Sequence, residues 1–195
     1  MSFCSATKYL SGHSDAMGGT LSVNKNVFKK IMTFYKLSGY RMSADEAYLI
    51  IRGLRTLDVR LKSHQENTKK VVNFLNRQKK VKEILYPHKP GSKNYKLWKK
   101  YYSGATGLLS IIIKSKKKAS VVKFVNSLEL FGIGYSWGGF ESLALLQELR
   151  KSTEYTKGRK YYRFNADEHI VRLHIGLEDP NDLINDLKKS LKFIK

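Results

Sequence analysis

Several side chains in this 195-residue sequence could take part in chemistry, and the first lies near its start. Lys8 carries an amine that can form a Schiff base with a carbonyl compound, and the hydroxyls of Ser5 and Thr7 come just before it. Far along the chain, Arg172 has a planar guanidinium that can bind a carboxylate through two parallel hydrogen bonds. Taken one at a time, these residue types are also common in turns and on exposed surfaces. Only the surrounding sequence can therefore indicate whether they have a functional role.

A glycine-rich segment is a second candidate feature. Residues 134–142 read Gly-Tyr-Ser-Trp-Gly-Gly-Phe-Glu-Ser, which places Ser136 and Trp137 between glycines. A glycine-flanked tryptophan usually packs over a core, and this alternative needs no ligand. The segment by itself therefore does not specify a function.

The elements that must position these residues begin with a strand and a helix. Residues 18–24 alternate in polarity as a strand does, and apolar residues then recur at helical spacing over residues 27–39. A capping box at residues 43–46 starts the next helix, and the apolar spacing extends it to about residue 77. We therefore predict one long helix over residues 43–77.

Beyond residue 77, short strands and helices alternate. The pattern predicts strands at 81–86, 106–114 and 169–176, helices at 121–131, 140–150 and 180–194, and a polar loop at 151–160. Alternation in the last strand would put Arg172 and His174 on the same face, which is typical of an exposed sheet face. This order of elements predicts an α+β domain in which helices cover a small sheet.

Composition narrows the class of protein. Hydrophobic residues make up 42%, which favours a packed globule, and the apolar stretches are far shorter than the roughly 20 residues that cross a bilayer. We also find no secretory signal, so we expect no membrane association and a cytoplasmic location. Cys4 is the only cysteine, and we expect its side chain to be buried. A single cysteine excludes an internal disulfide and a multi-cysteine metal site, and we expect no metal.

The formal net charge of +21 is the observation that favours a different function, because a basic surface attracts nucleic acid. The charges are spread along the chain, mostly on the polar faces of expected helices. Of the 37 basic residues, 28 are lysine, whereas base and phosphate recognition favours arginine. We interpret the charge as solvated helix faces and do not expect a nucleic-acid partner; a basic nucleic-acid-binding module is the alternative.

The segment around Lys8 resembles a known motif. Residues 5–15 read Ser-Ala-Thr-Lys-Tyr-Leu-Ser-Gly-His-Ser-Asp, which closely resembles the cofactor-attachment segment of the cystathionine synthase and lyase family. Members of this family use pyridoxal 5′-phosphate. The resemblance implies that Lys8 holds the cofactor aldehyde and later acts as a base at the α-carbon of the substrate. It also implies that Ser5 and Thr7 donate hydrogen bonds to the cofactor phosphate.

Two more stretches match the same family in the same order. Residues 52–57, together with 64–67, resemble the long helix that opens the family's C-terminal domain. The glycine-rich segment 134–142 is similar to the family's active-site loop, so Ser136 and Trp137 would line the substrate site. A tryptophan at this place is a feature of the family's β-lyases.

A last stretch, residues 172–178, reads Arg-Leu-His-Ile-Gly-Leu-Glu and resembles the C-terminal segment whose arginine grips the substrate's α-carboxylate. The resemblance makes Arg172 the candidate for this role. With it, the matching stretches run from residue 5 to residue 178 and cover almost the entire sequence.

The resemblance implies a pyridoxal-phosphate-dependent carbon–sulfur lyase. Its reaction would be the β-elimination of cystathionine to homocysteine, pyruvate and ammonia, a step of transsulfuration and methionine biosynthesis. Cystathionine γ-synthases, γ-lyases and methionine γ-lyases share nearly all of these motifs, so each remains an alternative. The resemblance also implies a homo-oligomer.

Family members have about half of their length before the attachment lysine, whereas seven residues precede Lys8 here. We therefore expect residues 1–42 to be a remnant of the α/β cofactor domain, poorly stable alone. Residues 43–195 would be the C-terminal domain of a fold-type I pyridoxal-phosphate enzyme. A second hypothesis follows, in which the chain is a truncated or split-gene fragment without activity alone, and its partner is a separate N-terminal half.

Overall fold

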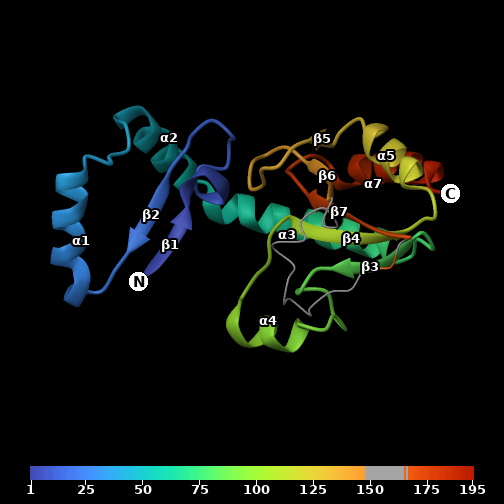
Figure 1. The fold of residues 1–195 in the computed structure, drawn as a ribbon, viewed down its shortest axis with the longest axis horizontal. Helices are drawn as coiled ribbons and strands as arrows, with labels where there is room; N and C mark the ends of the chain where they lie inside the picture. Colours follow the sequence, from blue (N-terminus) through green and yellow to red (C-terminus); the bar gives the residue numbers. More distant parts are fainter. Residues whose placement is uncertain (148–164, 166) are drawn as a thin grey trace.

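The computed structural model describes residues 1–147, 165 and 167–195, and its largest element is a five-stranded sheet (Figure 1). The strand order in this sheet is β3 (Val81–Leu85), β4 (Leu108–Lys114), β7 (Glu168–His174), β6 (Leu143–Gln147) and β5 (Gly132–Ile133). Neighbouring strands are antiparallel except for β5 and β6, which are parallel. The long strands β4 and β7 lie at its centre.

Three helices pack on one face of the sheet and form the core with it. They are α3 (Leu57–Leu75), α5 (Lys118–Asn126) and α7 (Pro180–Ser190), the last continued by the short η3 (Leu191–Phe193). Ile111 of β4 and Val171 and Leu173 of β7 are fully buried against them. Each such side chain contributes about 1.5–3 kcal/mol. The predicted α+β fold, with helices covering a small sheet, is confirmed.

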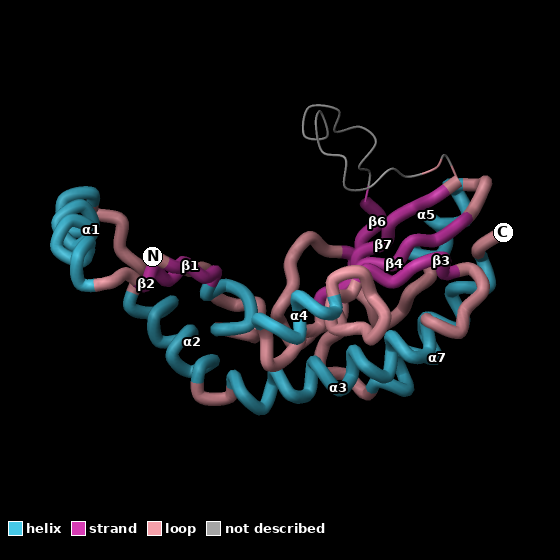
Figure 2. Tube along the Cα trace, turned by 90° about the horizontal axis from the view of Figure 1, so that it is seen from below, coloured by secondary structure: helices cyan, strands magenta, loops and turns pink. Residues whose placement is uncertain are grey.

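The N-terminal part has a much smaller apolar cluster. Strands β1 (Ser2–Ser5) and β2 (Gly19–Ser22) form an antiparallel hairpin, and the short η1 (Ala6–Leu10) lies in the connection between them. Helix α1 (Lys25–Ser38) follows and lies at the far end of the molecule from the sheet (Figure 2). It has no buried residue, and the cluster beneath the hairpin consists of Ala6, Ala16 and Ile50 with three partly buried neighbours.

The predicted long helix 43–77 is wrong in one respect, because it is two helices. Helix α2 (Ala44–Leu54) begins at the predicted cap, where the Ser43 hydroxyl accepts a hydrogen bond from the Glu46 N–H, and α3 begins at Leu57. At the break, the Gly53 carbonyl accepts a hydrogen bond from the buried guanidinium of Arg60 at 2.7 Å. The same carbonyl also accepts a hydrogen bond from the Thr56 N–H, which forms a tight turn between the two helices.

The predicted helix 140–150 is also wrong where it can be compared. Residues 143–147 form β6, which pairs with β7 from Leu143 opposite His174 to Gln147 opposite Ile170. Leucine and alanine favour helix as isolated residues, but pairing with the central strand outweighs this preference. Residues 148–150 and the predicted polar loop 151–160 lie outside the described residues.

Two smaller differences have clear causes. Helix α5 ends at Asn126 rather than at residue 131, because the N–H groups of Glu129 and Leu130 donate to the buried carboxylate of Asp186. Helix α4 (Tyr95–Tyr101), which the sequence pattern did not predict, follows the turn at residues 90–91. Cys4 is exposed, contrary to expectation.

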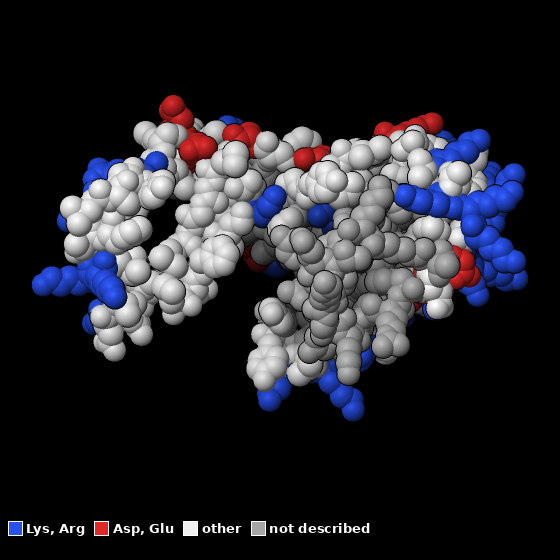
Figure 3. Space-filling model, in the orientation of Figure 1, with Lys and Arg blue, Asp and Glu red and all other residues white. Residues whose placement is uncertain are grey.

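Charged side chains do not form one continuous basic surface in the view of Figure 3. Lysine and arginine lie in separate groups, over α1 at one end, beyond α5 and α7 at the other end, and at the lower edge over α4. The described residues contain no helix that is long and apolar enough to span a membrane.

Hydrogen exchange should separate the two parts of the chain. We expect the amides of β2 and α1 to exchange much faster than those of β4 and β7, because α1 buries no side chain whereas β4 and β7 lie in the main core. The measurement is native-state exchange followed by mass spectrometry or NMR. Equal protection of residues 1–42 and of the sheet would refute the expectation.

Candidate active site

The Lys8 segment is held against the two helices α2 and α3. Lys8 has backbone angles of φ −91° and ψ −126°, which depart from those of a helix and turn the segment. Arg60 of α3 holds it by donating from Nη1 to the Tyr9 carbonyl at 2.8 Å and from Nη2 to the Leu10 carbonyl at 3.4 Å. Burial lowers the pKa of Arg60, but an arginine keeps its charge at any ordinary pH.

The glycine-rich loop lies directly on this segment. Gly138 has a φ of +84°, and a Cβ at this position would lie 2.7 Å from the Tyr9 nitrogen and 3.0 Å from the Lys8 carbonyl carbon. A residue other than glycine would therefore meet both backbone strain and a steric clash. The close approach brings residues 136–139 next to Lys8.

The far end of the loop has its own anchors. Glu178 accepts hydrogen bonds from the N–H and the hydroxyl of Ser142 at 2.6 and 2.8 Å, and the same hydroxyl accepts from the Gly176 N–H. Glu141 accepts from the hydroxyl of Ser14. The loop is thus attached both to the end of β7 and to the segment that follows Lys8.

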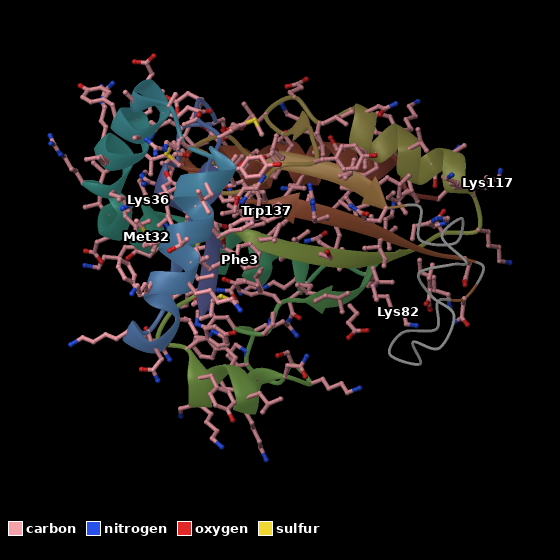
Figure 4. All side chains as sticks on the ribbon, turned by 60° about the vertical axis from the view of Figure 1, so that its left-hand side comes forward. Phe3, Met32, Lys36, Lys82, Lys117 and Trp137 are labelled. Carbon is pink, nitrogen blue, oxygen red and sulfur yellow. The ribbon has the colours of Figure 1, made fainter. Side chains whose placement is uncertain are left out.

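Four side chains predicted for the site lie together. The Lys8 Nζ donates to the Ser136 Oγ at 2.8 Å and lies 4.3 Å from the centre of the Trp137 ring. The Arg172 Cζ lies 5.8 Å from the centre of the same ring. In Figure 4, Trp137 lies at the centre of the molecule, where the N-terminal elements meet the sheet. Two cations within about 6 Å of one indole ring define a compact site.

Arg172 has donors to spare. Its Nη2 donates to the carbonyls of Gly134 and Ser136 at 3.0 and 3.2 Å, whereas Nη1 and Nε have no hydrogen-bond partner among the described residues. Burial lowers the pKa of this guanidinium, which still remains charged. A carboxylate placed over Trp137 could therefore be bound by the free donors.

Ser5 and Thr7 differ in what their hydroxyls do. The Thr7 hydroxyl accepts from the Gly18 N–H at 2.9 Å and donates to the Gly18 carbonyl at 3.3 Å, so it joins the two sides of the hairpin. The half-buried Ser5 hydroxyl has no hydrogen-bond partner among the described residues. Ser5 is the more available donor for a phosphate, and the phosphate role of both residues stays a prediction.

These groups suit an aldehyde cofactor with a phosphate. Lys8 offers an amine, Ser5 an uncommitted hydroxyl, and Arg172 a guanidinium that can bind a carboxylate. Among the described residues there is no cluster of histidine, cysteine, aspartate or glutamate that could hold a metal ion. The site therefore fits pyridoxal 5′-phosphate through residues of this chain.

Comparison with known proteins agrees with this geometry. The family model described as Cys/Met metabolism PLP-dependent enzyme matches residues 1–192. The chain belongs to this family. Pyridoxal 5′-phosphate is the cofactor that the family description names, and the resemblance inferred from the sequence motifs is confirmed.

Several relatives in the family are cystathionine β-lyases. MetC of Escherichia coli is 39% identical over 188 residues, and the enzyme of Bordetella avium is 40% identical over 193 residues; these matches cover 96% and 98% of this chain and 47% of each relative. Cystathionine γ-lyases match as well. The structure of cystathionine γ-synthase from Xanthomonas oryzae in complex with cystathionine superposes with a TM-score of 0.87 at 29% identity, covering 98% of this chain and 49% of that one. The chain thus spans about half the length of the relatives it matches.

Some residues that shape the site were not found from the sequence. Arg60 was passed over because it lies in none of the matching motifs, and Tyr9, although part of the Lys8 segment, was given no role of its own. Gly138 was noted only as part of a glycine-rich segment, although the pair Gly138–Gly139 beside a tryptophan is a signal for close backbone approach. His174 was expected to project beside Arg172 on an exposed sheet face, but it is 1% exposed.

Replacing Gly138 should show how much the loop contact contributes. Gly91 is a matched control, because its φ is +80° and a Cβ there would meet nothing within 4 Å. We expect Gly91→Ala to lose about 1 kcal/mol of unfolding free energy from backbone strain alone, and Gly138→Ala to lose about 2–4 kcal/mol because it also pushes the loop off Tyr9. Urea unfolding measures both. Equal losses would contradict the steric argument.

Acid should weaken the fold through His174. Burial lowers its pKa from 6.5 to about 4, so between these values the unfolded chain binds a proton that the folded chain does not. Stability should therefore fall as the pH falls from 7 towards 4, with His174 accounting for about 3 kcal/mol. Unfolding free energies at several pH values should show a shallower slope for His174→Gln. A similar slope in His174→Gln and in the unchanged chain would argue against this cause.

Proposed function

We propose that this chain contributes the lysine and the carboxylate-binding arginine of a pyridoxal-phosphate-dependent carbon–sulfur lyase whose substrate is cystathionine. The observation that carries the proposal is the arrangement of Lys8, Trp137 and Arg172. The Lys8 amine and the Arg172 guanidinium lie 4.3 and 5.8 Å from the same indole ring. An amino-acid substrate needs both groups within one small site, since its amine and its carboxylate are attached to the same carbon.

Each residue has a part in the proposed reaction. Arg172 binds the α-carboxylate with Nε and Nη1, while Nη2 stays on the loop carbonyls. Ser136 accepts a hydrogen bond from the Lys8 amine and so orients Nζ over Trp137. When bound, pyridoxal phosphate supplies an electron sink for the α-carbon. Lys8 would hold the cofactor through its amine and would move the α-proton of the substrate.

Trp137 favours β-elimination over the γ-reactions in this proposal. A β-lyase would release homocysteine, pyruvate and ammonia from cystathionine, whereas a γ-lyase would release cysteine, 2-oxobutyrate and ammonia. The two outcomes are separated by identifying the keto acid. Among the relatives, β-lyases and γ-lyases both occur, so product analysis is the deciding measurement.

A second candidate is a chain that has no activity alone. It is favoured by the coverage of the relatives, of which this chain spans about half. The proposal then places the site at a contact with a separate N-terminal half or with another copy of the chain. In that case the chain alone would attach the cofactor without turning over the substrate. Lys8 can react with the aldehyde by itself, but the remaining cofactor contacts come from the partner.

Cofactor attachment should be selective for Lys8. We expect incubation with pyridoxal 5′-phosphate, followed by borohydride reduction and peptide mass spectrometry, to label Lys8 above the other lysines, because Ser136 and Trp137 orient its amine. Lys8→Ala should lose this label and the associated absorbance band. The matched control Lys29→Ala removes an exposed lysine on α1 and should leave labelling of Lys8 unchanged.

The same preparation separates the candidates. Release of pyruvate from cystathionine by the chain supports an active β-lyase, whereas release of 2-oxobutyrate supports an active γ-lyase. Labelling of Lys8 without any keto acid supports the silent chain. Labelling spread evenly over exposed lysines would overturn the assignment of Lys8.

A further inference from the structure

A buried cluster of three rings lies beneath the loop and is not used by the proposed chemistry. Tyr9, His64 of α3 and His174 of β7 have ring centres 5.4, 5.9 and 5.3 Å apart, taken as Tyr9–His64, Tyr9–His174 and His64–His174. Both histidines are almost completely buried, at 0% and 1% exposure. Each also has one ring nitrogen without a hydrogen-bond partner among the described residues, Nε2 of His64 and Nδ1 of His174. Such groups are costly unless they are paired.

The proton of His64 can be assigned from its partner. Its Nδ1 lies 2.8 Å from the carbonyl oxygen of Ile175. A carbonyl only accepts hydrogen bonds, so Nδ1 carries the proton. Burial lowers the pKa of His64 and favours the neutral ring, which leaves Nε2 as a bare acceptor.

His174 has two possible arrangements. Its Nε2 lies 3.1 Å from the Gly138 N–H and 3.1 Å from the Gly139 carbonyl, and one neutral nitrogen cannot both accept from the first and donate to the second. A proton on Nε2 would donate to the Gly139 carbonyl, but it would also face the Gly138 N–H. In addition, the two unpartnered nitrogens, Nδ1 of His174 and Nε2 of His64, would both lack a proton. A proton on Nδ1 lets Nε2 accept from Gly138 but sets the Nε2 lone pair against the Gly139 carbonyl oxygen at 3.1 Å. In return, it leaves one donor on His174 and one acceptor on His64 in the same cluster.

We propose that His174 is held with its proton on Nδ1 and that His64 fixes it there, the Nδ1–H of His174 donating to the Nε2 of His64 through one water molecule. The two nitrogens make no direct hydrogen bond, and their ring centres lie 5.3 Å apart, so a single bridging water completes the link. The result is a histidine relay that runs from the Gly138 N–H through His174 and His64 to the Ile175 carbonyl. Every proton in this relay has an acceptor.

The relay makes His174 a positioning residue for the loop that carries Ser136 and Trp137. It holds the Gly138 N–H at the point where the loop lies on Lys8 and Tyr9. His64 has no described hydrogen bond to Lys8 or Trp137, so in this proposal its effect on the hydrogen bond of the Gly138 N–H passes through the proton of His174. The inference does not depend on bound cofactor and can be tested on the chain as it is.

The first test reads the tautomers directly. Two-bond ¹H–¹⁵N correlation spectra of the uniformly ¹⁵N-labelled chain near neutral pH distinguish protonated from bare imidazole nitrogens, and single His variants assign the signals. We expect the proton on Nδ1 in both His64 and His174. A proton on Nε2 of His174 would overturn the proposal.

The second test uses two replacements of His64 that keep different halves of its hydrogen bonding. Asparagine can still donate to Ile175 but has no acceptor at the place of Nε2, whereas glutamine offers an acceptor there and gives up the bond to Ile175. In a Trp98→Phe background, where Trp137 is the one remaining tryptophan, its emission reports the loop.

We expect His64→Asn to move the proton of His174 to Nε2, red-shift the Trp137 emission and increase its quenching by acrylamide. His64→Gln should keep the tautomer and the emission of the unchanged chain. A role of His64 limited to packing or to anchoring Ile175 predicts the reverse order, and that result, or equal effects of both replacements, would refute the relay. Should His64→Asn fail to fold, the tautomer of the unchanged chain and the glutamine variant still decide.

Discussion

The site depends on one backbone contact between segments about 130 residues apart in the sequence. Gly138 lies so close to Lys8 and Tyr9 that a single added carbon would displace one segment from the other. The interaction of the Lys8 amine with Ser136 and Trp137 is a consequence of this contact, since both residues are on the same short loop. The loop can be placed accurately because β7 holds its beginning through Arg172 and its middle through His174, and Glu178, just beyond β7, holds its far end.

The sequence predicted which side chains meet at the site better than it predicted how the site is built. Lys8, Ser136, Trp137 and Arg172 were found because they belong to motifs in which the reacting side chain must be of one type, and the structure places them together. Arg60 was missed because its partners beyond the Thr56 hydroxyl are backbone carbonyls, which leave no pattern in a sequence. The same holds for His174, whose burial comes from a loop packed over it rather than from any periodicity of β7. Residues that act through backbone groups are therefore the part of a site that motif analysis does not find.

The fold shows the same division between local and long-range information. The start of α2 and the strands β4 and β7 follow from a cap or from apolar alternation, which are properties of neighbouring residues. The strand β6 could not be inferred in this way, because Leu-Ala-Leu-Leu-Gln suits a helix and becomes a strand only beside β7. Likewise, the break between α2 and α3 lies where Arg60 donates a hydrogen bond to the Gly53 carbonyl. The same guanidinium holds the Lys8 segment by donating to the Leu10 carbonyl.

The position of Lys8 follows from the C-terminal part of the chain more than from the N-terminal part. Helix α1 contributes no buried side chain, and the cluster under the hairpin is small. The segment from Lys8 to Leu10, in contrast, is held by Arg60 from α3, covered by Gly138 from the loop, and packed through the Tyr9 ring against His64 and His174. All of these groups are fixed by the main core. The geometry of the amine relative to Trp137 and Arg172 is therefore set by the sheet and α3, and would persist even if β2 and α1 were to open.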